Sequence, residues 1–186
     1  MRPLRLEVQG FMAFKGPQQI DFAGLDLFAI VGPTGSGKSA LLDAMTFALY
    51  GSTPRLGKKD MKPLISTGES VASVSLEFEV RGERYKVARR QGHKSSGNQV
   101  SLEQELDGRW RPLSGNKVAD INARIVEAVG LDFAAFTRAV LLPQGEFSAF
   151  LKGTGLERQK LLGELTNLGE VEHMAVFART RWKELD

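Results

Sequence analysis

One stretch of this sequence decides the fold: Gly32-Pro33-Thr34-Gly35-Ser36-Gly37-Lys38-Ser39, which matches the pattern G-x-x-x-x-G-K-[ST] at every fixed position. The apolar run 27–31 before it is typical of a buried strand, and residues 40–49 after it have the apolar spacing of a helix. A strand, a glycine-rich loop and a helix in this order are the context of a phosphate-binding loop. The glycines let backbone N–H groups of the loop and of the helix N-terminus converge on an anion.

The residues of this loop have predicted roles in binding a nucleotide. Lys38 supplies a positive charge to the β- and γ-phosphates, and the hydroxyl of Ser39 can ligate Mg²⁺. Further contacts are expected from the rest of the loop and the first helical turn: Pro33, Thr34, Gly35, Ser36, Gly37 and Ala40. The pattern therefore predicts a bound nucleotide with Mg²⁺.

Composition places the chain among ordinary globular proteins. It has 186 residues, 42% of them hydrophobic and 25% charged, with a net charge of +3. No apolar run approaches the roughly 18 to 20 residues of a membrane span, and the alternating residues 1–7 are unlike a signal peptide. Because cysteine is absent from the sequence, disulfides and thiolate metal sites are excluded, and we expect a cytoplasmic protein without membrane partners.

The elements around the loop indicate an α/β fold. Strands are expected at residues 4–8, 18–22 and 27–31. The third strand leads into the loop, so we expect a mixed sheet around the helix that follows the loop. Residues 71–113 then alternate with period two and include the hairpin signal Asp107-Gly108, which predicts an antiparallel meander. A meander at this position disfavours the plain β-α-β alternation of kinases and GTPases.

Helical patterns follow the meander. Residues 119–129 are amphipathic and end at Gly130, and we expect a helical lobe over 118–151 that completes a head domain of residues 1–155. Residues 156–186 have leucines near heptad spacing and stop without a cap or breaker. We interpret them as the truncated start of a coiled-coil helix.

Positive charge is concentrated in the middle of the chain. Residues 52–112 hold 12 Lys and Arg against 8 Asp and Glu. The candidate basic side chains of this part are Arg84, Lys86, Arg89, Arg90 and Lys94. Two interpretations stay open, a lobe that faces nucleic acid and a solvated face of a sheet.

The sequence offers no complete site for hydrolysis, which needs a carboxylate for the metal and a group that orients water. No apolar strand ends in paired acids, so a stand-alone P-loop kinase is not expected. The segment Asn116-Lys117-Val118-Ala119 has alanine where a guanine-reading motif has aspartate, so GTP specificity is not expected. Gln144 stands in a loop after an apolar segment, where its amide oxygen could ligate Mg²⁺ or it could be an ordinary polar loop residue.

Two segments of the sequence resemble the SbcC family of SMC-like ABC ATPases. They are residues 30–51, which contain the loop, and residues 136–147, which contain Gln144, with about 105 residues between the two motifs. A Phe-x-x-Phe element at Phe11 and Phe14 adds to the resemblance. The resemblance implies the N-terminal half of an ABC-type ATPase head that binds ATP and Mg²⁺.

The resemblance also implies roles and partners that spacing alone does not. Gln144 would join Ser39 on Mg²⁺ and sense the γ-phosphate, and Lys62 and Ile65 would contact the base. The signature motif, the Walker B acids and the catalytic glutamate would come from a C-terminal half beyond a coiled coil. Two heads would enclose two ATP molecules, with an SbcD-type nuclease and double-stranded DNA as partners. The chain departs from relatives at Met12, near which many carry a phosphate-binding arginine. A DNA-binding scaffold, in which nucleotide only regulates assembly, is the alternative function.

Overall fold

The computed structural model describes residues 1–57, 60–113, 117–141 and 154. The chain divides into two compact units, Met1–Phe133 and Ala134–Asp186. The first unit contains the phosphate-binding loop and all the described strands, and the description below concerns this unit unless stated otherwise.

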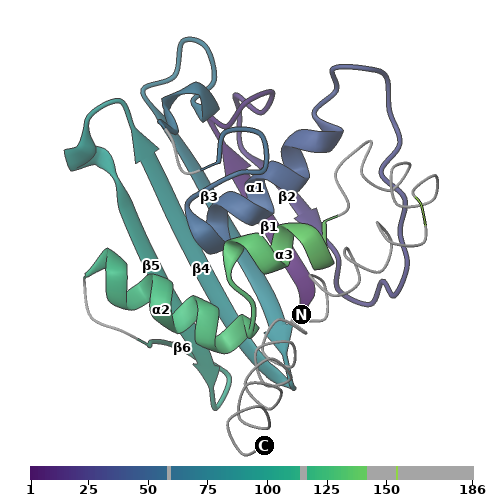
Figure 1. The fold of residues 1–186 in the computed structure, drawn as a ribbon, viewed down its shortest axis with the longest axis vertical. Helices are drawn as coiled ribbons and strands as arrows, with labels where there is room; N and C mark the ends of the chain where they lie inside the picture. Colours follow the sequence, from purple (N-terminus) through teal and green to yellow (C-terminus); the bar gives the residue numbers. More distant parts are fainter. Residues whose placement is uncertain (58–59, 114–116, 142–153, 155–186) are drawn as a thin grey trace, which may run out of the picture. The chain divides into compact units, whose positions relative to one another are not determined.

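The described strands form one six-stranded sheet in the order β2-β1-β3-β4-β5-β6 (Figure 1). The strands are β1 (Arg2–Gln9), β2 (Gln18–Asp21), β3 (Val71–Val80), β4 (Glu83–Gly92), β5 (Gln99–Leu106) and β6 (Arg109–Pro112). All five pairings are antiparallel. The expected meander is confirmed as β3 to β6. In the sheet it lies beside the hairpin of β1 and β2, because β3 pairs with β1. The α/β fold class is confirmed as well.

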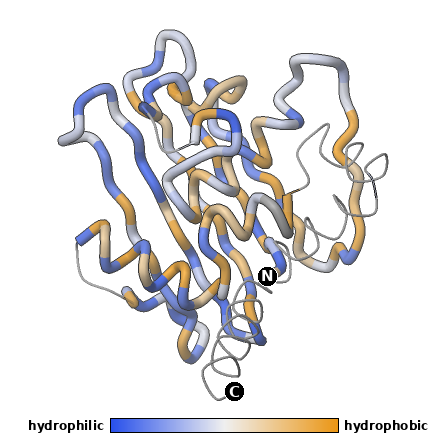
Figure 2. Tube along the Cα trace, viewed as in Figure 1, coloured by the Kyte–Doolittle hydropathy of each residue, from blue (hydrophilic) through white to orange (hydrophobic). Residues whose placement is uncertain are grey.

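One face of this sheet forms the core. Along β3 the even-numbered residues Ala72, Val74, Leu76 and Phe78 are buried, while the odd-numbered serines and glutamates between them are half-buried. Figure 2 shows the same alternation of hydrophobic and hydrophilic positions along the strands. Each fully buried large apolar side chain contributes about 1.5–3 kcal/mol, so the sequence alternation determines which face packs against the helices.

Helix α1 (Lys38–Tyr50) lies on the apolar face, in contact with β3 and β4 (Figure 1). Nine of its 13 residues are buried, and Phe47 packs against Phe11 with ring centroids 5.7 Å apart. The helix ends at Gly51, whose φ of 64° lets its N–H reach the carbonyl of Phe47 at 2.8 Å. The predicted helix after the loop is therefore confirmed, and the sheet fixes it in place.

Two further helices follow the meander. Helix α2 (Val118–Val129) buries Ile121 and Ile125 and contacts β5, and Gly130 caps its C-terminus as expected. Helix α3 (Phe133–Ala139) begins at the last residue of the first unit. Two short 3-10 turns lie in connections: η1 (Lys62–Leu64) between α1 and β3, and η2 (Ser95–Gly97) between β4 and β5.

The predicted strand at residues 27–31 is wrong. The structure assigns no strand to this segment, and it is largely exposed, with Leu27 92% and Val31 86% exposed. Only Phe28 has an aromatic neighbour, Phe22, with ring centroids 4.9 Å apart. A strand needs a partner for its backbone groups, and none of the five pairings among the described strands includes this segment. Residues 27–31 are apolar as a buried strand requires, but no described strand lies beside them to pair with their backbone.

Several expectations lie outside the described residues. They concern Gln144, the end of the helical lobe after residue 141, and the coiled-coil helix of 156–186. The domain boundary at residue 155 stays a prediction for the same reason. In the described part of the chain no helix is long and apolar enough to cross a membrane.

Candidate functional site

The phosphate-binding loop joins the exposed apolar segment to α1. Gly35 and Gly37 have φ angles of 86° and 95°, in the left-handed region that residues with a Cβ rarely adopt. The N–H of Ser36 donates to the carbonyl of Pro33 at 3.2 Å, which closes a turn inside the loop. The loop is exposed, so its backbone groups are accessible to a ligand.

The N-terminus of α1 carries partial positive charge, and neither its N-cap residue nor its first turn supplies an acidic side chain to offset it. Gly37 is the N-cap and has no side chain to bond the free N–H groups, and the first turn contains no acidic residue. The partial positive charge of the helix dipole therefore faces the loop. Ser39 stands in this first turn and is exposed, whereas Ala40 beside it is buried at 5% exposure and anchors the turn to the core.

The ammonium of Lys38 lies over the loop that precedes it. Its Nζ donates to the carbonyl oxygens of Gly32 and Pro33, each at 2.8 Å. An ammonium has three donors, so these two bonds leave capacity for an anion. Lys38, the free N–H groups and the exposed Ser39 hydroxyl thus gather at one helix end, which is a donor set suited to phosphate oxygens and a hard cation.

The expected base-contacting residues lie in a separate loop. Lys62 begins η1 and is exposed, with its Nζ 3.8 Å from the Oδ2 of Asp60. Ile65 is 9% exposed and pairs its backbone with Phe11. The structure therefore places the backbone of this loop beside the residues 11–14, while contact of Lys62 and Ile65 with a base stays a prediction.

A contact that the sequence prediction missed involves residues 13 and 14. A Cβ atom added to Gly37 would stand 2.8 Å from Cζ of Phe14 and 3.3 Å from Cβ of Ala13. The residues 11–14 therefore lie directly against the phosphate-binding loop. The Phe-x-x-Phe element was the signal in the sequence, although its spacing does not say what the second ring touches.

The basic side chains of the meander do not form one surface. Arg84 lies 3.4 Å from Glu105, and Lys86 lies 3.1 Å from Glu77, so both are in ion pairs along the polar face of the sheet. Arg89 points to the opposite, apolar face and is only 8% exposed. Arg90 and Lys94 are the two exposed candidates for which the structure describes no ion pair. This arrangement favours a solvated sheet face over a nucleic-acid-binding lobe.

Arg89 instead holds the C-terminal end of α1. Its Nε donates to the carbonyl of Ala48 at 3.0 Å, and Nη2 donates to the carbonyl of Leu49 at 3.1 Å and to Oδ1 of Asn122 at 2.7 Å. Burial lowers the pKa of Arg89 to about 10. A cation at the negative end of the helix dipole stabilises the helix, and Asn122 links it to α2.

A buried carboxyl stands one turn beyond Ser39 on α1. The side chain of Asp43 is 7% exposed, and its Oδ2 lies 3.2 Å from Nη2 of Arg55 in the loop after α1. Burial raises the pKa of Asp43, and the charge of Arg55 opposes that shift. The pair ties the loop of residues 52–57 to the helix that carries the phosphate site.

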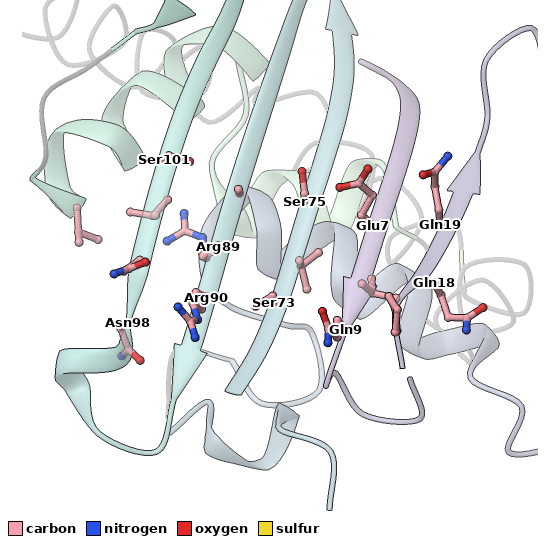
Figure 3. Close-up of a pocket in the computed structure, with 17 residues that line it drawn as sticks. Glu7, Gln9, Gln18, Gln19, Ser73, Ser75, Arg89, Arg90, Asn98 and Ser101 are labelled. Atoms are coloured by element: carbon pink, nitrogen blue, oxygen red, sulfur yellow. The ribbon is translucent and has the colours of Figure 1, made fainter. Parts of the chain in front are cut away.

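A cavity of about 840 Å³ lies on the polar face of the sheet, where the close-up in Figure 3 shows the helices behind the strands. Serines 73, 75 and 101 line it together with Glu7 and Arg90. None of its lining residues belongs to the phosphate-binding loop. The nucleotide chemistry is thus expected at the exposed loop and not in this hollow.

Comparisons with known proteins identify the family of the chain. Residues 5–175 match the family described as "AAA domain". The chain is 53% identical over 99% of its length to the SbcC component of the SbcCD nuclease of Deinococcus radiodurans, of which it covers 20%. It is 42% identical over 100% of its length to "Probable DNA double-strand break repair Rad50 ATPase" of Aquifex aeolicus, of which it covers 18%. The chain thus spans about a fifth of the length of these curated relatives.

Among solved structures, the "SMC head domain from Thermotoga maritima" shares 29% identity with a TM-score of 0.44, covering 67% of this chain and 42% of that chain. The family match extends over most of the chain and includes the whole phosphate-binding loop. The sequence resemblance to SbcC is confirmed by the relatives named above. The chain belongs to the AAA domain family, and over its whole length it is similar to the SbcC component of SbcCD nucleases.

Proposed function

We propose that this chain is the ATP-binding half of the head of a DNA-repair ATPase that closes on ATP and controls a partner nuclease. The observation that carries the proposal is the donor set at the N-terminus of α1, where Lys38 and uncapped N–H groups face the exposed loop. The names of the relatives, a nuclease component and a double-strand break repair ATPase, support the process and the partner.

The residues at the loop fit ATP with Mg²⁺. The N–H groups of residues 35–39 and the Lys38 ammonium would hold the phosphates, and the Ser39 hydroxyl would ligate the metal. Gln144 would complete the metal ligands from the protein. When bound, Mg²⁺ neutralises charge that develops on the phosphates during transfer to water.

The proposal includes a requirement for a second half. The exposed apolar segment of residues 27–31 needs neighbouring strands, and a C-terminal half that supplies them would bury Leu27 and Val31. The first turn of α1, which follows the loop, contains no acidic side chain that could hold the metal. The same half would supply the acids for hydrolysis, and a second head would enclose the nucleotide.

Two states would then control the nuclease. ATP bound between two heads shifts the population towards the closed dimer, because the nucleotide contacts both heads only in that state. Double-stranded DNA and an SbcD-type nuclease would bind the assembly. An SMC-like scaffold whose nucleotide only regulates assembly is the other hypothesis, and the ion-paired Arg84 and Lys86 do not favour it.

The test is nucleotide binding by the chain, measured by titrating a fluorescent ATP analogue with Mg²⁺. The proposal predicts saturable binding that the Lys38→Ala variant weakens at least about tenfold, because the variant loses a charged phosphate contact. The control is Lys117→Ala, an exposed lysine that precedes α2 and lies outside the phosphate-binding loop and its neighbours, which is expected to bind as the wild type does. Equal affinity in the wild type and in Lys38→Ala would overturn the proposal.

A further inference from the structure

Residues 11–14 form a tight turn that packs against the phosphate-binding loop. The N–H of Phe11 donates to the carbonyl of Phe14 at 2.9 Å, and the N–H of Phe14 donates to the carbonyl of Phe11 at 2.8 Å. Met12 at the tip has a φ of 49°, which a residue with a Cβ adopts at a cost. A turn with this strain persists only where its surroundings hold it.

Two contacts hold the turn at its base. The ring of Phe11 is fully buried and packs against Phe47 of α1. The N–H of Gly10 donates to the carbonyl of Lys15 at 3.0 Å, which extends the pairing beyond the turn. The turn is therefore a rigid extension of β1 and not a free loop.

A second loop, residues 61–66, fastens the tip. The N–H of Met12 donates to the carbonyl of Leu64 at 2.7 Å, and the hydroxyl of Ser66 donates to the carbonyl of Met12 at 2.8 Å. Ser66 is 3% exposed, and its N–H also donates to the carbonyl of Gly10 at 2.8 Å. Both main-chain groups of Met12 are thus bonded to residues of one loop, Leu64 and Ser66, and these bonds offset the strain at Met12.

The side of the turn that carries Ala13 and Phe14 approaches the phosphate-binding loop at Gly37. The Cζ and Cε1 atoms of Phe14 lie where a side chain at Gly37 would stand, at 2.8 and 3.3 Å from an added Cβ. Gly37 is the N-cap of α1, with a φ of 95°. The direction of the first N–H groups of α1 depends on this backbone conformation, and the ring of Phe14 limits how far it can move.

We propose that Phe14 is a positioning residue for the phosphate-binding loop, and that Ser66 holds Phe14 in place through Met12. The ring keeps Gly37 in its left-handed conformation, so that the N–H groups of α1 point at the phosphates before a nucleotide binds. The loop fastened by Ser66 also carries Lys62, so one set of contacts joins the phosphate site to a loop beside it. This inference rests on nucleotide binding at the loop, as proposed above, and adds residues that do not touch the nucleotide.

The experiment measures the dissociation constant of the fluorescent ATP analogue and the melting temperature without nucleotide. Phe14→Ala is expected to weaken binding about tenfold, because preorganisation of the N–H groups is lost. Phe14→Leu, which keeps an apolar side chain against Gly37, is expected to bind within about threefold of the wild type. Ser66→Ala, which removes only the hydroxyl, is expected to weaken binding about fivefold.

The matched control is Phe133→Ala, which removes another half-buried ring. Phe133 contacts the opposite end of α1, with its centroid 5.9 Å from that of Tyr50. This variant is expected to lower the melting temperature and to leave the dissociation constant within about twofold of the wild type. A role of Phe14 in stability alone would give Phe14→Ala the same behaviour as this control.

The outcomes separate the two proposals. If Lys38→Ala abolishes binding but Phe14→Ala and Ser66→Ala bind as the wild type does, the positioning role is overturned and the proposed function stands. If the wild type does not bind, or Lys38→Ala binds equally well, both proposals fall. If Phe14→Ala does not fold, the folded Ser66→Ala decides, and an unchanged dissociation constant in that variant overturns the positioning role.

Discussion

At the scale of single residues, Arg89 differs most from its predicted role. The sequence groups it with four other basic side chains as a candidate for a nucleic-acid-binding lobe, yet it is buried against the C-terminal end of α1. The signal is present in the sequence, because Arg89 alternates in phase with Tyr85 and Val87, which face the core. Alternation predicts which face a side chain takes, but not that a cation finds three carbonyl and amide oxygens there.

Arg89→Met is expected to destabilise the chain by about 2–4 kcal/mol, because two buried carbonyl oxygens and the part-buried amide oxygen of Asn122 lose a charged donor. Urea denaturation measures the loss. The control is Arg111→Met on an exposed arginine 3.9 Å from Asp107, which is expected to change stability by less than about 1 kcal/mol. Equal small effects of the two variants would contradict the role assigned to Arg89.

Asp43 gives stability a predictable pH dependence. Since the pKa of Asp43 is raised above its ordinary value, the folded state binds the carboxyl proton more tightly than the unfolded state does. The stability that this group contributes therefore falls as the pH rises from the ordinary pKa of an aspartate through the raised pKa of Asp43. Asp43→Asn lacks this dependence. The stability of the variant relative to the wild type should therefore increase between about pH 4 and about pH 7, as measured by urea denaturation at both values. A relative stability that decreases over this range would mean that the pair with Arg55 outweighs burial.

At the scale of elements, the sequence correctly predicted the strands and helices whose signals lie in neighbouring residues. The meander and α1 follow from period-two alternation, turn signals and the glycines that end the helix. The strand at residues 27–31 could not be predicted reliably, because an apolar run becomes a strand only when another strand pairs with it. The described sheet ends at β2 on one side and at β6 on the other, and neither of these edge strands pairs with this segment.

The exposed segment yields a prediction that separates stability from assembly. Leu27→Ser and Val31→Ser are expected to change the stability of the chain alone by less than about 0.5 kcal/mol, since both side chains face solvent. Both should reduce association with a C-terminal half, measured by titration calorimetry. Leu106→Ser, at a partly exposed apolar residue at the end of β5, is the control and should leave association unchanged. Equal association by all three variants would contradict burial of the segment on assembly.

At the scale of the whole molecule, the candidate site is only partly predictable from sequence. Lys38, Ser39 and the glycines form a contiguous motif, so the pattern alone located them. Phe14 and Ser66 come from loops about 20 to 30 residues away on either side, and only the folded sheet brings them to Gly37 and Met12. The same holds for Gln144, Lys62 and the proposed second half, whose roles depend on contacts between distant segments.

The most direct test of the half-head hypothesis is ATP turnover, measured for the chain alone and after the matching C-terminal half is added, with Lys38→Ala as the control. We predict turnover that appears only on mixing and is absent in the variant, because the acids for hydrolysis come from the second half. Comparable turnover by the chain alone would contradict the account, since it would require a complete catalytic site within these residues.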